Sequence, residues 1–167
     1  MEEYYILCQL AITTAGFAAL ASLIKPKSQS LDLGYKLNLV RFYIMIEFAV
    51  TVAAFGFLPI VLMGFLDEEL NFRISSGILF AFAVPLYKYT MNRNKALSGT
   101  VNIGGMHTKV TRIFGLTAIL ILLINAIGLL KPYYSESYLA ALYIIFLLSL
   151  NLFYRLIINS VKQHPKK

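Results

Sequence analysis

Five long runs of apolar residues alternate with short polar segments along the chain. Each run is about 18–24 residues long, so as a helix it can cross a hydrocarbon layer of roughly 30 Å. The runs lie near 4–24, 42–66, 70–89, 110–130 and 136–158. The pattern predicts an all-α polytopic membrane protein, with five transmembrane helices in an antiparallel bundle.

Composition agrees with a membrane environment. Of the 167 residues, 59% are hydrophobic and 14% are charged. Soluble domains have about 45–50% apolar and 25% charged residues. The segments between the runs are too short to hold a separate soluble domain of roughly 50 residues or more. We therefore expect residues 1–167 to form a single transmembrane domain.

Lysine and arginine residues predict the orientation. If the N-terminus lies outside the cytoplasm, the cytoplasmic segments are 25–41, 88–112 and 155–167, with loops at 25–41 and 88–109. These segments hold 13 of the 15 Lys and Arg residues, all except Arg73 and Lys131. Because positive residues in short loops stay inside, this bias predicts N-out and C-in. So basic an inner face favours contact with anionic lipid, and we expect no nucleic-acid partner.

One acidic residue, Glu47, falls inside a predicted span. An ionised side chain at membrane depth costs several kcal/mol unless it is paired, hydrated or protonated. Glu47 belongs to a stripe of polar and small residues at the 3–4 spacing of one helix face. The stripe consists of Lys36, Val40, Tyr43, Glu47, Thr51, Ala54 and Leu58. A pore or a water-filled cavity requires such a stripe.

Glu47 has two interpretations. In the first, its carboxylate forms a structural ion pair with a cation near the inner boundary. Three cations end their spans there, namely Lys88, Arg112 and Arg155. Arg155 is the favoured partner, because Asn151 and Asn159 stand one turn from it on the same helix face. In the second interpretation, Glu47 is a functional carboxyl in a permeation path or a proton site.

Small and polar residues elsewhere predict further contacts. Gln9 in the first run and Asn125 in the fourth lie at a similar outer depth. A hydrogen bond between their amides would contribute roughly 1 kcal/mol. Gly16 and Ala19 predict that the first helix approaches a neighbour closely. We expect residues 91–108 to form the longest irregular segment.

The sequence offers little for catalysis or for a cofactor. Cys8 is the single cysteine, so no internal disulfide forms, and we expect its thiol to be buried. His107 and His164 both lie outside the spans, which leaves no buried histidine for heme, zinc or a proton relay. Motifs such as His-Glu-x-x-His and Gly-x-Ser-x-Gly are absent. We therefore expect no catalytic residues, no metal site, no cofactor and no enzyme activity.

Short stretches spread along the chain carry a resemblance. They are Ala15-Gly16-Phe17-Ala18-Ala19-Leu20, Arg41 and Glu47 ahead of Phe57-Leu58-Pro59, Asn125-Ala126-Ile127-Gly128-Leu129, and Phe153-Tyr154-Arg155-Leu156. Through them the chain resembles an uncharacterised family of small bacterial membrane proteins. The resemblance implies five spans in a bacterial inner membrane, and it implies no activity.

These patterns favour one function over two alternatives. A five-helix bundle encloses little room, so a permeation path would be built by several subunits, and the leading hypothesis is a homo-oligomeric, channel-like protein that passes small ions. One alternative is a non-catalytic scaffold or accessory subunit, in which Glu47 is locked to Arg155 and segment 91–108 docks a partner. The other is a small proton-coupled transporter that uses Glu47. The candidate pore or buried polar residues are Glu47, Thr51, Arg155, Asn151, Gln9 and Asn125.

Overall fold

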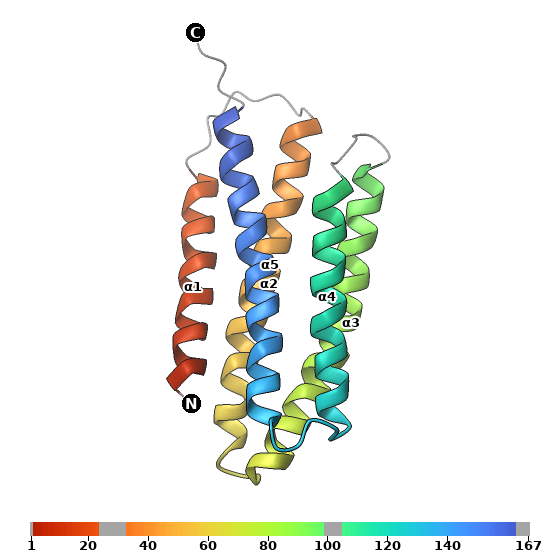
Figure 1. The fold of residues 1–167 in the computed structure, drawn as a ribbon. Coiled ribbons are helices and arrows are strands. Elements are labelled where there is room, and N and C mark those ends of the chain that lie inside the picture. The colour runs from red at the N-terminus through yellow and green to blue at the C-terminus, as the bar shows by residue number, and fades with distance from the viewer. Residues whose placement is uncertain (1, 24–32, 99–104, 163–167) are drawn as a thin grey trace.

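The computed structural model of the chain describes residues 2–23, 33–98 and 105–162. Within these ranges the chain is all-α. Its helices are α1 (Glu2–Leu23), α2 (Leu33–Leu62), α3 (Glu68–Ser98), α4 (Gly105–Ala126) and α5 (Tyr134–Lys162). Helices that follow one another in the sequence run in opposite directions, so the bundle is antiparallel (Figure 1).

Four of the described helices are long and apolar enough to cross a membrane. The candidate spans are Leu39–Leu62, Glu68–Arg93, Lys109–Ala126 and Tyr134–Ile158. The prediction of an all-α protein with transmembrane helices is confirmed to that extent. α1 is not among the four, so the fifth span and the orientation of the chain stay predictions.

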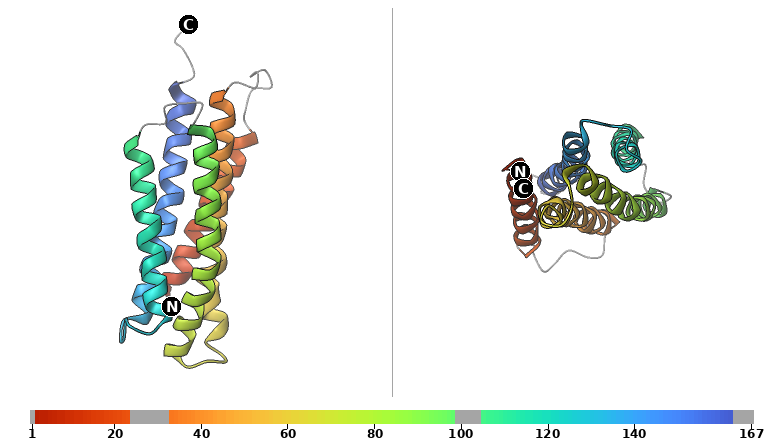
Figure 2. Two further views of the ribbon diagram at one scale, coloured as in Figure 1. Left: turned by 90° about the vertical axis from the view of Figure 1, so that its right-hand side faces the viewer. Right: turned by 90° about the horizontal axis from the view of Figure 1, so that it is seen from below.

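α2 and α5 form the centre of the bundle. α1 packs on one side of this pair, and α3 and α4 lie on the other (Figure 2). Two hydrogen bonds set the register between the central helices. Tyr138 Oη donates to Phe55 O at 2.7 Å, and Ser149 Oγ donates to Met45 O at 2.9 Å. The register is antiparallel, so each step forward along α5 is level with one step back along α2.

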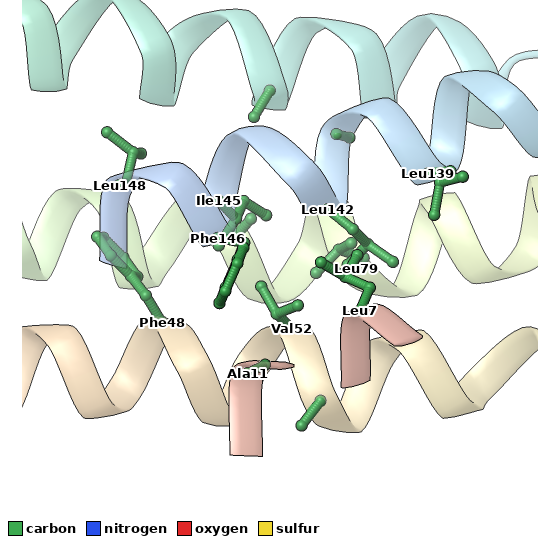
Figure 3. Close-up of a cluster of buried hydrophobic side chains, with 14 of the residues drawn as sticks. Leu7, Ala11, Phe48, Val52, Leu79, Leu139, Leu142, Ile145, Phe146 and Leu148 are labelled. Atoms are coloured by element: carbon green, nitrogen blue, oxygen red, sulfur yellow. The ribbon is translucent and has the colours of Figure 1, made fainter. Parts of the chain in front are cut away.

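Apolar side chains fill the space around the central pair. Figure 3 shows them converging from α1, α2, α3 and α5. They include Leu7, Ala11, Phe48, Val52, Leu79, Leu142 and Phe146. Large apolar side chains also cover the outer faces, for example Phe17, Val61, Ile113, Leu120 and Leu147. Lipid tails solvate such faces, whereas water would not, and the distribution therefore fits a bilayer.

The closest approach of α1 to α2 occurs at Gly56. A β-carbon on Gly56 would collide with Sγ of Cys8, which is buried as expected and donates to Ala53 O at 3.4 Å. The prediction that Gly16 and Ala19 mark the close contact was wrong. Both lie on the exposed side of α1, and a β-carbon on Gly16 would meet nothing within 4 Å.

The segment 91–108 is mostly helical, so the prediction of a long irregular segment there was wrong. α3 continues to Ser98 and α4 begins at Gly105. From Leu86 to Ser98 the sequence contains no glycine or proline, and nothing in it ends a helix. Arg93 is therefore part of α3 and not of a loop.

Candidate functional site

Basic residues of the candidate spans gather at one end of the bundle. We call it the basic end: the end at which α2 and α4 begin and α3 and α5 finish (Figure 1). The cations there whose side chains the structure describes are Arg41, Lys88, Arg93, Lys109, Arg112 and Arg155. The acidic residue nearest to them in the described ranges is Glu47 of α2.

Glu47 forms an ion pair with Arg93 of α3. Its Oε1 lies 3.5 Å from Arg93 Nη1, and the two side chains are 35% and 25% exposed, respectively. Side chains on a helix lean toward the helix N-terminus. Because α2 and α3 are antiparallel, Glu47 leans toward the basic end and Arg93 leans away from it, so the two groups meet. The Arg93 guanidinium also lies 5.0 Å from the ring centroid of Tyr89.

The expected pair between Glu47 and Arg155 was wrong. In the α2–α5 register, Ser149 is level with Met45, so the position level with Glu47 lies near residue 147. Arg155 stands about eight residues further along α5, which is roughly 12 Å along the helix axis. Arg93 was not among the expected partners, because the third span was predicted to end at residue 89. The sequence has no glycine or proline between residues 89 and 98, and this absence could have indicated that the helix continues past residue 89.

Thr51 is part of the bundle interior. It is 5% exposed, and its Oγ1 donates to Glu47 O at 2.6 Å. Beside it lies a cavity of about 30 Å³ between α2, α3, α4 and α5. The walls also include Phe48, Ala83, Leu86, Tyr87, Gly115, Ala118, Ile119, Ile145 and Leu148. The cavity has room for about one or two water molecules, but its walls offer them almost no polar partner.

The stripe predicted from Glu47 does not line one common space. Tyr43 and Ala54 are exposed, Glu47 is half-buried and Thr51 is buried. The side chain of Lys36 lies outside the described residues. The members of the stripe therefore lie partly on the surface and partly in the core.

Arg155 lies at the basic end of α5, three residues before the candidate span Tyr134–Ile158 ends. Its Nε and Nη2 are buried and have no hydrogen-bond partner in the part of the chain that the structure describes. Arg41 of α2 is close enough for the two positive charges to repel each other. Asn151, one turn before Arg155, is half-buried, and the side chain of Asn159 lies outside the described residues.

At the opposite end, the expected hydrogen bond between Gln9 and Asn125 was wrong. Asn125 is fully buried, and its Nδ2 donates to Ser76 Oγ at 2.8 Å and to Tyr134 O at 3.0 Å. Gln9 is exposed on α1. Among the described residues α1 contacts α2 and α5 but not α4, so the two amides do not meet.

Buried polar groups of α3 at this end were missed by the sequence analysis. Asn71 is fully buried, and its Nδ2 donates to Pro59 O at 2.8 Å, which joins α3 to α2. Ser75 Oγ lies 3.3 Å from Asn71 Oδ1, and Ser76 accepts from Asn125. The one-turn spacing of Asn71 and Ser75 within a predicted span was the available signal, since unpaired polar groups are costly there.

Glu69 fastens the connection between α4 and α5 at the same end. Its carboxylate lies 3.0 Å from Lys131 Nζ and 3.5 Å from Arg73 Nη1. It also accepts a hydrogen bond from Tyr134 Oη at 3.2 Å. The hydrogen bond to Glu69 raises the pKa of the Lys131 ammonium. These groups are partly or mostly exposed, so the charges contribute modestly to stability.

Neither a metal-binding cluster among the described residues nor a similar known protein indicates a function. In residues 2–23, 33–98 and 105–162, no three His, Cys, Asp or Glu side chains gather as a metal site would require. Comparisons with protein families, curated proteins and solved structures find no match to this chain. The proposals below therefore depend on the geometry of the bundle.

Proposed function

We propose that the chain is a non-catalytic membrane scaffold or accessory subunit. The observation that carries the proposal is the ion pair between Glu47 and Arg93. It places Glu47 at a contact between α2 and α3, where a paired charge stabilises packing. A carboxylate that guides ions would instead have to face a hydrated path.

The interior of the single bundle also supports a scaffold. Apolar side chains of α1, α2, α3 and α5 pack around the central pair, as Figure 3 shows. The cavity beside Thr51 is apolar, and the Thr51 hydroxyl already donates its hydrogen to Glu47 O. An ion leaving water would find no set of ligands there to replace its hydration shell.

The oligomeric channel is the second candidate, with its path between copies of the chain. One observation favours it: Glu47 keeps 35% of its side chain exposed, although it lies within a candidate span. Its Oε2 is buried and has no hydrogen-bond partner among the described residues. A second copy packed against this surface would bring Glu47 to a shared interface. A proton-coupled transporter would use the same carboxylate.

Ion flux in liposomes separates these candidates. Reconstituted wild-type protein of defined oligomeric state is expected to pass no ions at any voltage or pH. Glu47→Gln is expected to lower thermal stability, whereas Glu136→Gln, which changes an exposed acid at the opposite end, leaves stability unchanged. If the protein passes ions, and Glu47→Gln alters this flux without affecting folding or assembly, the channel proposal would replace the scaffold proposal. Uptake of a solute that depends on pH and on Glu47 would favour the transporter.

We further propose that all five helices cross a bacterial inner membrane, with the N-terminus outside. α1 has 22 residues, a length of about 33 Å, and it lies along α2 and α5 in Figure 1. In a Cys8→Ala background, a membrane-impermeant maleimide should label Glu3→Cys but not Lys166→Cys in intact spheroplasts. Labelling of both positions, or of neither, would place the termini on one side and leave four spans.

A further inference from the structure

We propose that Arg41 and Arg155 form a binding site for a phosphate group at the basic end of the bundle. The phosphate would come from the headgroup of an anionic phospholipid or from solution. The site is separate from the Glu47–Arg93 pair and does not depend on the function proposed above.

Arg155 presents one edge of its guanidinium without an acceptor. Nε and Nη2 are both buried and unpartnered in the described ranges. These two nitrogens share the side of the guanidinium from which two parallel N–H groups project. That fork matches two oxygens of a phosphate or carboxylate, which it binds in a bidentate manner. A buried charged donor without an acceptor is unfavourable, so the geometry points to an anion.

Arg41 adds a second positive charge at the same level. Because Ser149 lies opposite Met45, Arg155 is level with a position near residue 39 of α2, within about one turn of Arg41. The two guanidinium charges repel each other. An anion held between them would turn this repulsion into two attractions. The binding of one group by both arginines would also link the two central helices.

The described acidic residues do not fill this role. Glu47 is bound to Arg93 and lies roughly 12 Å further along the axis. The remaining described carboxylates lie in α1 or at the opposite end of the bundle, in 2–3, 67–69 and at 136. Asp32 lies outside the described residues, so the experiment below tests it as an alternative partner.

The position of the two arginines matches the level of lipid phosphates. Arg41 lies near the start of the candidate span Leu39–Leu62, and Arg155 lies near the end of Tyr134–Ile158. Lipid phosphates sit where the hydrocarbon layer ends, and basic side chains at that level attract anionic lipids. Tyr43 and Tyr154, which are 49% and 64% exposed, flank the arginines, as tyrosines do at membrane interfaces.

Thermal unfolding in maltoside detergent tests the site. Cys8 is the single cysteine and is buried, so a thiol-reactive fluorogenic dye reports unfolding of the unmodified chain. Phosphatidylglycerol is expected to raise Tm by several degrees, whereas diacylglycerol with the same acyl chains leaves it unchanged. A similar rise with inorganic phosphate would identify free phosphate as a sufficient ligand, and a rise with the lipid alone would identify the headgroup. Equal shifts with phosphatidylglycerol and diacylglycerol would refute the site.

Variants assign the effect to the two arginines. Arg155→Gln and Arg41→Gln are each expected to remove most of the phosphatidylglycerol shift. Lys88→Gln, an exposed cation at the same end, should keep it. A lipid shift that survives in both arginine variants would contradict the proposal.

A further variant detects an internal partner of Arg155. Without phosphate or lipid, Arg155→Met is expected to leave Tm unchanged or to raise it, because it removes buried donors that lack an acceptor. A large fall in Tm for Arg155→Met, matched by Asp32→Asn, would mean that Asp32 already neutralises Arg155. That result would overturn the phosphate site.

Discussion

Replacing Tyr138 with alanine is expected to lower the free energy of unfolding by about 3–5 kcal/mol. Tyr138 is fully buried in α5, and its ring centroid lies 6.2 Å from that of Tyr4 and 6.1 Å from that of Phe72. The three rings join α1, α3 and α5. The substitution would leave a cavity at this junction and would remove the hydrogen bond from Tyr138 Oη to Phe55 O.

Thermal or denaturant unfolding in detergent, followed through the thiol of Cys8, measures this loss. Tyr138→Phe keeps the ring and removes only the hydroxyl, so its effect should be near 1 kcal/mol. Tyr143→Ala is the matched control, because Tyr143 is on the same helix but is 39% exposed. If Tyr138→Ala and Tyr143→Ala destabilised the chain equally, the aromatic junction would not hold the helices together.

Arg93→Ala is expected to destabilise the bundle by about 2 kcal/mol, because it leaves an ionised Glu47 in a candidate span without its cation. The value is below that of a fully buried pair, since the two side chains are 25% and 35% exposed. The measurement is the same unfolding assay, at a pH where the carboxyl is ionised. Lys88→Ala, which removes an exposed cation from α3, should have little effect.

A double variant separates the ion pair from simple loss of side-chain volume. Glu47→Gln in the Arg93→Ala background removes the unpaired charge, so the double variant should be more stable than Arg93→Ala alone. The four proteins form a double-mutant cycle, and a coupling energy near zero would mean that the contact between the charges contributes nothing.

The helices could be predicted from sequence because each depends on its own residues. Runs of apolar residues locate the membrane-crossing segments, and the four candidate spans overlap four of the predicted runs. The error in α3 lies at its end, where polar residues outnumber apolar ones. α3 extends to Ser98 because its polar residues after Tyr89 are compatible with a helix, although they are too polar to be counted in a span.

The polar partners could not be predicted, because they depend on how the helices are placed relative to one another. Whether Glu47 meets Arg93 or Arg155 depends on the axial register and on the rotation of three helices. Gln9 and Asn125 share a depth in the sequence pattern, but α5 and α2 separate α1 from α4 in the bundle (Figure 2). The depth of a residue in the membrane can be predicted from its own helix, whereas its neighbours depend on how all the helices are arranged.

The central position of α5 has a consequence for how the protein is made. The α1–α2 and α3–α4 hairpins consist of neighbours in the chain, so each can form as soon as its second helix leaves the ribosome. α2, however, finds its main remaining partner only in α5, which is translated after both hairpins. We therefore expect α5 to pack against hairpins that have already formed, and the two hydrogen bonds that set its register, donated by Tyr138 and Ser149, can form only at that step.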